Sequence, residues 1–339
     1  MGKPWVSNTK YIAATAMRNH LFLLSFFILT LGGVTLAQAQ TETNFPTLMR
    51  IVVPFPPGGS NDVIARAAAP SLAKRLGNSV IVDNRAGAAG VIGSDAVAKS
   101  ARDASVLLLT SSTLLTTAAT QSSVPYDPAS AFAAIAMIAQ GPLLLAVTSS
   151  APFKSPADLL NGARSQPGVL NYGTAGVGSV AHLATELLNG RAAIQMTHVP
   201  YKGAANALID LAAGHIGVMI SNYSSLVSQI KSGKVRALAV TSQKPSPAFP
   251  GLPPLAVAVP GYAIDIWVGV FAPAGTPAPL IERLNREINE ISASPEVRVF
   301  LDPDGAAPAA MSAAAFAARI RDDLAQWKKI AAERKIKVD

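Results

Sequence analysis

Cysteine is absent from all 339 residues of the chain. Its absence excludes disulfide bonds, thiolate metal sites and the lipid-modified N-terminal cysteine that some exported proteins carry. Charged residues are scarce, at 14% of the chain, and aromatic residues make up only 6%, whereas half of all residues are apolar. A chain of this composition has enough apolar residues to bury a sizeable core, and its length suits two domains of ordinary size.

Acidic residues are missing from the start of the chain as far as Glu42. Three basic residues precede the apolar run 21–36, and Ala37-Gln-Ala39 fits a small-x-small cleavage site. This pattern is typical of a secretory signal peptide. A membrane anchor is the alternative, but the run is short for a span and no stop-transfer flank follows. We therefore predict that residues 1–39 form a signal peptide, cleaved near Ala39, and that the protein is exported.

The net charge is positive but carries no sign of a nucleic-acid partner. Removal of the three basic leader residues takes the formal charge from +8 to +5 (8 − 3), because the leader holds no acid. The remaining basic residues are scattered, except for a group near the C-terminus that is typical of the solvated face of a helix. A mildly basic surface could help to attract anionic solutes.

Strand-like and helix-like segments alternate from Met49 onward. Short apolar strands are predicted at 51–53, 80–82 and 106–109, with helices between them. Strands separated by helices imply a parallel sheet whose binding loops lie at the carboxyl ends of the strands. The polar loops that follow these three strands should therefore converge at one edge.

The first of these loops, Pro54-Phe-Pro-Pro-Gly-Gly59, is the stretch around which the chain is organised. Its prolines stiffen it, and its glycines let the backbone come close to a ligand. The helix that opens at Ser60 presents free N–H groups and the positive end of its dipole, which suits an anion such as a carboxylate. The alternative is an ordinary strand-to-helix turn.

A second series of strands and helices follows an apolar crossing at 143–147. It contains a second glycine loop, Gly173-Thr-Ala-Gly-Val-Gly-Ser179, and a tight polar turn that ends at Gly203. The apolar segment 264–271 then runs back into the first unit. Two lobes joined by only two strand-like crossings make a hinge over a cleft.

Taken together, these loops resemble the periplasmic receptors of tripartite tricarboxylate transporters, also called Bug (Bordetella uptake gene) receptors. The resemblance covers nearly all of the chain after the leader. It rests on seven segments in order: Pro54–Gly59 with Asp62; Asn84-Arg85 with Gly87 and Gly90; Tyr126-Asp-Pro128; Tyr172-Gly173 with Gly176–Ser179 and His182-Leu183; His198–Gly203; Gly233–Ala239; and Trp267–Gly269 with Ala272–Pro277.

The resemblance implies an α/β, two-lobed periplasmic-binding-protein fold (Venus flytrap, type II) with two crossover strands. Lobe 1 would comprise residues 40–149 and 264–339, and lobe 2 residues 150–263. It also implies a monomeric periplasmic receptor that delivers a small organic, amino or aromatic acid to two integral membrane subunits. Departures from the family pattern, such as Gly217 in place of an acid, leave the identity of the acid open.

Ligand contacts are expected on two opposed jaws with hydroxyl groups nearby. By resemblance, one jaw would be Phe55, Pro57, Gly58, Ser60 and Asp62, and the other Thr174, Ala175, Gly178 and Ser179, with Tyr201 and Lys202 nearby. The residue types add the hydroxyls of Ser111 and Thr113 as cleft candidates. Backbone N–H groups and hydroxyls are typical of a pocket that holds a small polar ligand.

Binding fits these residues better than catalysis. No paired carboxylates at useful spacing, nucleophile elbow or metal-ligand cluster is present, so neither a catalytic residue nor a metal nor a cofactor is expected. The glycine loop at 173–178 has the spacing G-x-x-G-x-G, which is wrong for a dinucleotide. A Ser179–His182 pair lacks an orienting acid, and an N-cap is the better interpretation. An exported two-domain enzyme and a signalling receptor remain the alternative functions.

Overall fold

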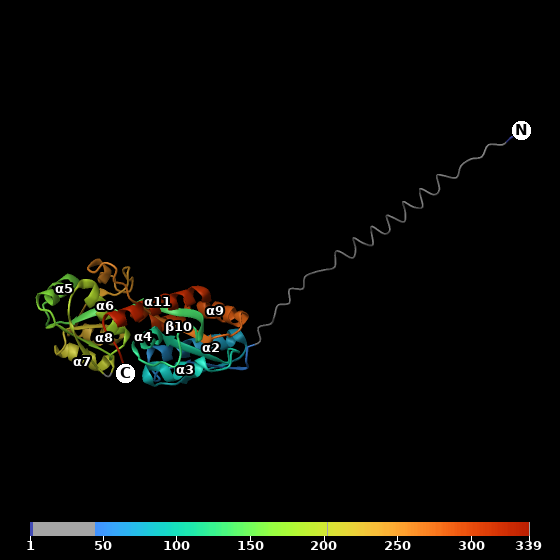
Figure 1. Ribbon diagram of the computed structural model, residues 1–339, viewed down its shortest axis with the longest axis horizontal. Coiled ribbons are helices and arrows are strands. Elements are labelled where there is room, and N and C mark those ends of the chain that lie inside the picture. Colours follow the sequence, from blue (N-terminus) through green and yellow to red (C-terminus); the bar gives the residue numbers. More distant parts are fainter. Residues whose placement is uncertain (3–44, 202, 339) are drawn as a thin grey trace. The chain divides into compact units, whose positions relative to one another are not determined.

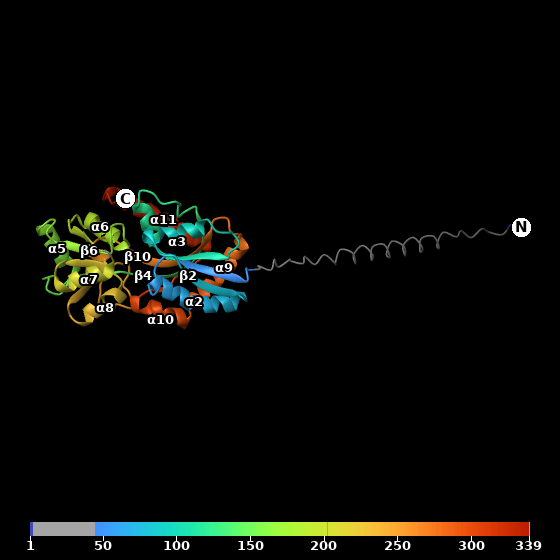
Figure 2. The same ribbon diagram turned by 90° about the horizontal axis from the view of Figure 1, so that it is seen from below.

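The computed structural model describes residues 1–2, 45–201 and 203–338. The predicted cleavage site near Ala39 and the predicted ligand residue Lys202 lie outside these residues. The chain divides into residues 1–42 and a compact unit of residues 43–339. All elements named below belong to the second unit, and Figures 1 and 2 show their arrangement.

The first sheet has six strands in the order β11-β4-β10-β3-β1-β2. β1, β2 and β3 are parallel, with Ile51 opposite both Val82 and Leu107. This confirms the parallel arrangement predicted for these three strands, whereas β10 is antiparallel to β3 and β4. β10 enters this sheet on its return from the second one, without the helical crossover that parallel neighbours need. The bounds are β1 Leu48–Val53, β2 Ser79–Asn84, β3 Val106–Ser111, β4 Phe132–Pro142, β10 Asp265–Pro273 and β11 Ala307–Pro308.

The second sheet has five strands in the order β7-β6-β8-β5-β9. β6 is parallel to β7 and β8, whereas β5 is antiparallel to β8 and β9. A single residue, Leu143, separates β4 of the first sheet from β5 of the second. The bounds are β5 Leu144–Thr148, β6 Asn171–Thr174, β7 Thr197–Pro200, β8 Val218–Ser221 and β9 Val235–Val240.

Helices cover both faces of the first sheet, which explains why its strands are apolar runs without alternation. Ile51 and Val53 belong to a core shared with α2, α9 and α10, whereas Val52 belongs to a core shared with α4 and α11. The helix bounds are α2 Ser60–Leu76, α3 Val91–Ala98, α4 Thr113–Thr120, α5 Pro156–Ser165, α6 Val180–Ala192, α7 Ala204–Ala213, α8 Tyr223–Lys231, α9 Ala278–Ser292, α10 Pro295–Leu301 and α11 Ala313–Glu333; the short 3₁₀ turns are η1 Ala88–Gly90, η2 Leu255–Val257 and η3 Asp302–Asp304.

Local signals in the sequence correctly predicted several helix ends. Ser155 caps α5 in a capping box with Asp158, and Gly77 and Gly214 end α2 and α7 in the left-handed conformation. α2 runs through Pro70 as one element. The predicted apolar face of α11 is buried throughout, at Phe316, Ile320, Leu324, Trp327 and Ile330.

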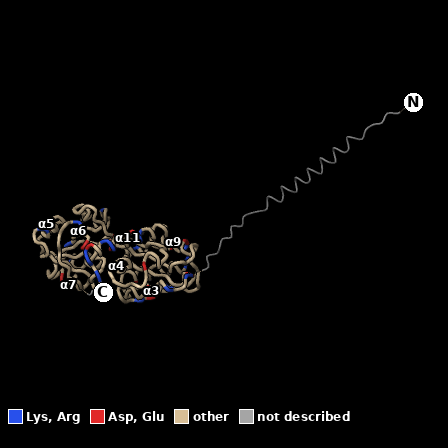
Figure 3. Tube along the Cα trace, in the orientation of Figure 1, with Lys and Arg blue, Asp and Glu red and all other residues tan. Residues whose placement is uncertain are grey.

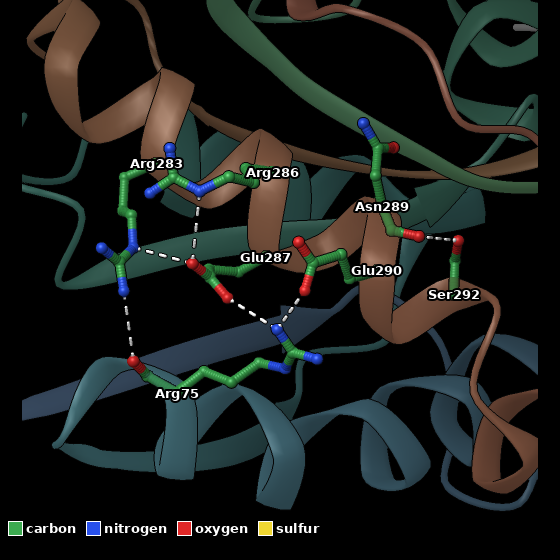
Figure 4. Close-up of polar contacts among 7 residues, drawn as sticks. All are labelled: Arg75, Arg283, Arg286, Glu287, Asn289, Glu290 and Ser292. Carbon is green, nitrogen blue, oxygen red and sulfur yellow. Dashed lines mark hydrogen bonds and ion pairs between the residues drawn. The ribbon is translucent and has the colours of Figure 1, made fainter.

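An ion-pair network joins the end of α2 to α9 (Figure 4). Arg75 of α2 contacts Glu287 (3.0 Å) and Glu290 of α9. Arg283 and Arg286 contact the same Glu287 carboxylate at 2.8 and 3.6 Å. The Glu287 side chain is only 8% exposed. One buried carboxylate therefore contacts three guanidinium groups.

We expect Glu287→Gln to destabilise the protein by about 1–3 kcal/mol, because it leaves three arginines close together with less compensating charge. The arginines are one-third to one-half exposed, so water weakens their mutual repulsion. The free energy of unfolding in urea measures the effect. Glu290→Gln is the matched control, since Glu290 is 54% exposed and its loss should cost at most about 0.5 kcal/mol. Equal effects of the two changes would contradict the prediction.

Candidate ligand-binding site

The three loops at the carboxyl ends of β1, β2 and β3 converge, as predicted. Asn84 Nδ2 donates to the Phe55 carbonyl oxygen at 3.2 Å. A Cβ atom at Gly90 would lie 3.5 Å from the Phe55 ring, an ordinary contact distance, so the two loops pack against each other; the φ of +94° at Gly90 favours glycine there. On the α4 side, Thr117 Oγ1 donates to the Ala89 carbonyl at 3.4 Å. These contacts bring segments 54–59, 84–90 and 111–117 to one edge of the sheet.

The first glycine loop ends with N–H groups at the start of α2. The first helical hydrogen bond runs from Val63 N to the Gly59 carbonyl (3.0 Å), so the N–H groups of Ser60 and Asn61 precede it. Neither has an acceptor within the described residues. Phe55 is half-buried, whereas Pro57, Gly58 and Ser60 are exposed. The loop thus offers the N–H of the exposed Ser60 to an anion, with that of the buried Asn61 directly after it.

Asp62 supports this loop from within. Its side chain is 4% exposed and accepts hydrogen bonds from Gly58 N (2.8 Å), Arg66 Nε (3.0 Å) and Asn84 Nδ2 (2.9 Å). Burial alone raises the pKa of Asp62, but the hydrogen bonds from Arg66, Gly58 and Asn84 hold it below its usual value. Both carboxylate oxygens therefore already have partners in the protein, and Asp62 holds Gly58 in position.

Ser111 and Thr113 lie at the end of β3, on the same edge. Ser111 Oγ donates to Thr113 Oγ1 at 3.0 Å, and both residues are half-buried. Between them, Ser112 donates its N–H to the Trp267 carbonyl (3.0 Å). The predicted polar loop is short, because α4 begins at Thr113 itself.

The second glycine loop follows β6 and is bonded mostly to itself. Thr174 is fully buried, and its hydroxyl bonds to both the N–H and the carbonyl of Gly176. Ser179 caps α6 by accepting the His182 N–H (3.3 Å), which confirms the N-cap interpretation. Gly178 N donates to His182 Nδ1 at 3.1 Å. The N–H groups of the exposed residues Ala175 and Val177 have no acceptor within the described residues.

Tyr201 lies beside this loop but points its hydroxyl elsewhere. The hydroxyl donates to Asp210 Oδ2 of α7 at 2.6 Å. Burial and this bond to a carboxylate raise the pKa of Tyr201 to about 12. The Tyr201 carbonyl oxygen would lie 3.4 Å from a Cβ atom at Gly176, so the backbone of Tyr201 packs against the loop.

Helix α4 and the C-terminal segment connect the two glycine loops, a role that the sequence did not reveal. A Cβ atom at Gly178 would lie 2.5 Å from Thr120 Oγ1 and 3.0 Å from Val338. Val338 N donates to the Thr120 carbonyl at 2.8 Å. Thr117, on the same helix as Thr120, bonds to the loop that holds Gly90. The second glycine loop is therefore linked through α4 to loop 84–90, which in turn packs against Phe55 of the first glycine loop.

A hollow in the described residues lies away from these loops. A cavity of about 480 Å³ lies beside α8 and β9 and is mainly apolar; it is lined by Leu144, Ser149, Tyr223, Ile230, Gly233, Val235, Arg236, Ala237, Phe249 and Leu252. None of the predicted ligand residues lines it.

Among residues 45–201 and 203–338, no three His, Asp or Glu side chains are grouped to hold a metal ion. Within the same ranges, no helix combines the length and apolarity needed to cross a membrane. Basic and acidic positions are interspersed along the trace (Figure 3).

Comparison with known proteins places the chain in a family. The family model described as "Tripartite tricarboxylate transporter family receptor" matches residues 64–336. Protein BugT of Bordetella pertussis is 36% identical over 320 residues, which covers 94% of this chain and 98% of BugT. A UPF0065 protein from the tcbD–tcbE intergenic region of Pseudomonas sp. strain P51 is 38% identical over 312 residues, covering 89% and 93% of the two chains.

Solved structures also match this chain over most of its length. Rpa4515 of R. palustris with adipate matches with a TM-score of 0.74 and 36% identity, covering 86% of this chain and 98% of the other. MatC of Rhodopseudomonas palustris with bound malate matches with a TM-score of 0.72 and 29% identity, covering 84% and 99%. The periplasmic binding protein BugD matches with a TM-score of 0.72 and 29% identity, covering 86% and 99%. The chain therefore has the Venus-flytrap fold of these receptors and belongs to the tripartite tricarboxylate transporter receptor family.

Proposed function

We propose that this protein is a periplasmic receptor that captures a small carboxylate between loops 54–59 and 174–179 and delivers it to two integral membrane subunits. The observation that carries the proposal is the set of unpartnered N–H groups at the start of α2, on Ser60 and Asn61, directly after the glycine loop. Such a set suits a carboxylate, because the helix dipole adds to the hydrogen bonds. Membership in a receptor family whose members have been solved with adipate and with malate supports it.

Each of the two loops leaves two N–H groups free for a ligand. In the second loop, the N–H groups of Gly176 and Gly178 are bonded internally, which leaves those of Ala175 and Val177 for a ligand. In the first loop, Asp62 occupies the N–H of Gly58, which leaves those of Ser60 and Asn61. We therefore assign the main-chain contacts to these four donors. The hydroxyls of Ser60 and Ser179 lie beside them.

The proposal includes the lobe limits and the mode of action. Lobe 1 comprises residues 40–149 and 264–339, lobe 2 comprises residues 150–263, and the mature receptor is a periplasmic monomer. Closure of the lobes on the acid gives the membrane subunits a loaded form that they can distinguish from the empty one. Ser179 and His182 do not favour the enzyme alternative, because Ser179 serves as an N-cap and the acceptor nitrogen of His182 is already occupied.

A ligand screen with a matched pair of glycine variants tests the proposal. Adipate, malate, aromatic acids and amino acids are added to the mature protein, and at least one should raise the melting temperature and give a calorimetric Kd. Gly58→Val should remove that shift, because Gly58 has a φ of +83° that valine rarely adopts, and the loop must change. Gly233→Val is the control, since Gly233 has a φ of +73°, equally open surroundings and a place away from the loops.

Two outcomes would contradict the proposal. If no acid raises the melting temperature of the unmodified protein, the chain is not a carboxylate receptor. If the two valine variants lose equal amounts of affinity, the effect is general destabilisation, and loop 54–59 is not the ligand contact.

A further inference from the structure

A buried histidine and a half-buried one lie against each other behind the second glycine loop. The rings of His182 on α6 and His198 on β7 are 3.8 Å apart and nearly parallel, at 15°. Tyr172 of β6 stacks on His198 at 4.9 Å. Only His215 is a further histidine in residues 40–339, and its side chain is 72% exposed. The two stacked rings therefore form a titratable pair directly beneath a proposed ligand loop.

Each ring bonds to one end of the loop. Gly178 N donates to His182 Nδ1 at 3.1 Å, and an N–H group can only donate, so this nitrogen must be unprotonated. The His182 imidazole is consequently neutral, with its proton on Nε2. At the other end, His198 Nε2 lies 2.7 Å from Thr174 Oγ1, which can act as donor or acceptor. The His182 bond is therefore the one that depends on protonation state.

The nearby Glu186 carboxylate favours a protonated imidazole at both rings, but less than burial opposes it. Glu186, one turn along α6, accepts from Tyr172 Oη (2.7 Å) and Asn189 Nδ2 (2.9 Å) and is paired with Arg334 at the end of α11. Its charge is thus already compensated. β8 and α4, which also pack against α6, hold no ionisable residue.

Burial has the larger effect and favours the neutral form of both rings. It lowers the pKa of His182 to about 4, with the neighbouring His198 adding to the effect, and it also lowers the pKa of His198. The folded protein therefore binds fewer protons at these sites than the unfolded chain, whose histidines titrate near pH 6.5. This contribution to stability is fully present above about pH 6.5 and is lost as the pH falls toward about 4.

We propose that the His182–His198 pair is a proton-sensitive support of the second glycine loop. A proton on His182 Nδ1 removes the acceptor of the Gly178 N–H and places two donors face to face. The loop then leaves its binding conformation, and the bound carboxylate dissociates. The last step rests on the proposed function, whereas the loss of the Gly178 bond does not.

The first test needs no ligand. In the mature protein, NMR follows the ring protons of the three histidines and the hydrogen exchange of the Gly178 amide from about pH 8 to about pH 3.5, a range that spans the lowered pKa of His182. Protonation of His182 should coincide with loss of Gly178 protection, with His215 as the exposed reference. Protection of Gly178 that persists after His182 has titrated would overturn the proposal.

The second test uses a carboxylate found in the ligand screen, or adipate as the default probe. Because half of the His182 rings are protonated near their pKa of about 4, the Kd of the unmodified protein should rise about twofold between pH 7.5 and pH 4 through this group, beyond the change that titration of the probe causes. His182→Asn should flatten that profile, because the amide oxygen can replace Nδ1 as acceptor and does not titrate. His215→Asn should keep the pH profile of the unmodified protein. Titration of the probe itself affects all three proteins equally, so a difference between their profiles comes from the histidines.

A profile for His182→Asn that matches the unmodified protein would overturn the proposal. If that variant does not fold, His198→Gln gives the second comparison, since it removes one titrating ring of the pair and keeps a partner for Thr174. If no acid binds at any pH, the proposed function fails, and the NMR experiment alone decides whether the histidine pair supports the loop.

Discussion

Ser60→Asp is expected to abolish carboxylate binding while the protein stays folded and becomes no less stable. Ser60 is exposed and occupies the first position of α2, directly after the glycine loop. An aspartate there would place its own negative charge where the ligand carboxylate is proposed to bind. Two like charges at a shared set of donors repel by several kcal/mol, so affinity should fall by a factor of about 100 or more.

The same substitution should favour folding. A negative side chain in the first turn of a helix interacts favourably with the helix dipole, by about 0.3–1 kcal/mol. The melting temperature without ligand should therefore stay constant or rise, while the ligand-induced shift disappears. These opposite directions separate loss of binding from loss of structure.

Ser60→Asn is the matched control, because it has nearly the same shape as aspartate and carries no charge. It should keep most of the affinity, as measured by calorimetry at constant salt. If Ser60→Asp binds the acid as well as Ser60→Asn does, the ligand carboxylate does not lie at the start of α2, and the first jaw is assigned wrongly.

Trp267→Ala is expected to cost about 3–5 kcal/mol of folding free energy. Trp267 lies on β10 and is 1% exposed, with its ring 5.4 Å from Phe316 and 6.1 Å from Phe271. Its Nε1 donates to Asp323 Oδ2 of α11 at 2.9 Å. Removal of the indole leaves a cavity among packed rings and takes a donor from a half-buried carboxylate. Urea unfolding measures the loss.

Trp267→Phe separates the contribution of ring packing from that of the hydrogen bond to Asp323. It keeps an aromatic ring in the core but loses the hydrogen bond to Asp323, and it should cost about 1–2 kcal/mol. From the sequence, Trp267 could either wall the pocket or pack in the core. A Trp267→Ala protein with unchanged stability and lost ligand affinity would show that the residue forms part of the pocket wall and not of the core.

The elements that the sequence predicted well have local signals. The apolar stripe of α11 and the Ser155 capping box each lie within one helix, and both are present in the structure. The elements that it missed lack such signals. α4 reads Thr-Leu-Leu-Thr-Thr-Ala-Ala-Thr and has poor helix formers at half its positions, yet Thr116 and Thr120 bond back to the helix backbone.

By itself, the sequence determined the two glycine loops, the helices that follow them, and hence the type of ligand donor at each. It could do so because a loop's conformational freedom and a helix's first N–H groups depend on neighbouring residues. Only the tertiary structure decided which donors stay free. The partner of Gly178 on α6, the neutral state of His182 and the pairing of Arg334 with Glu186, 148 positions earlier, all depend on packing between elements. Such contacts join residues that are far apart in the sequence, so a pattern of neighbouring residues cannot predict them.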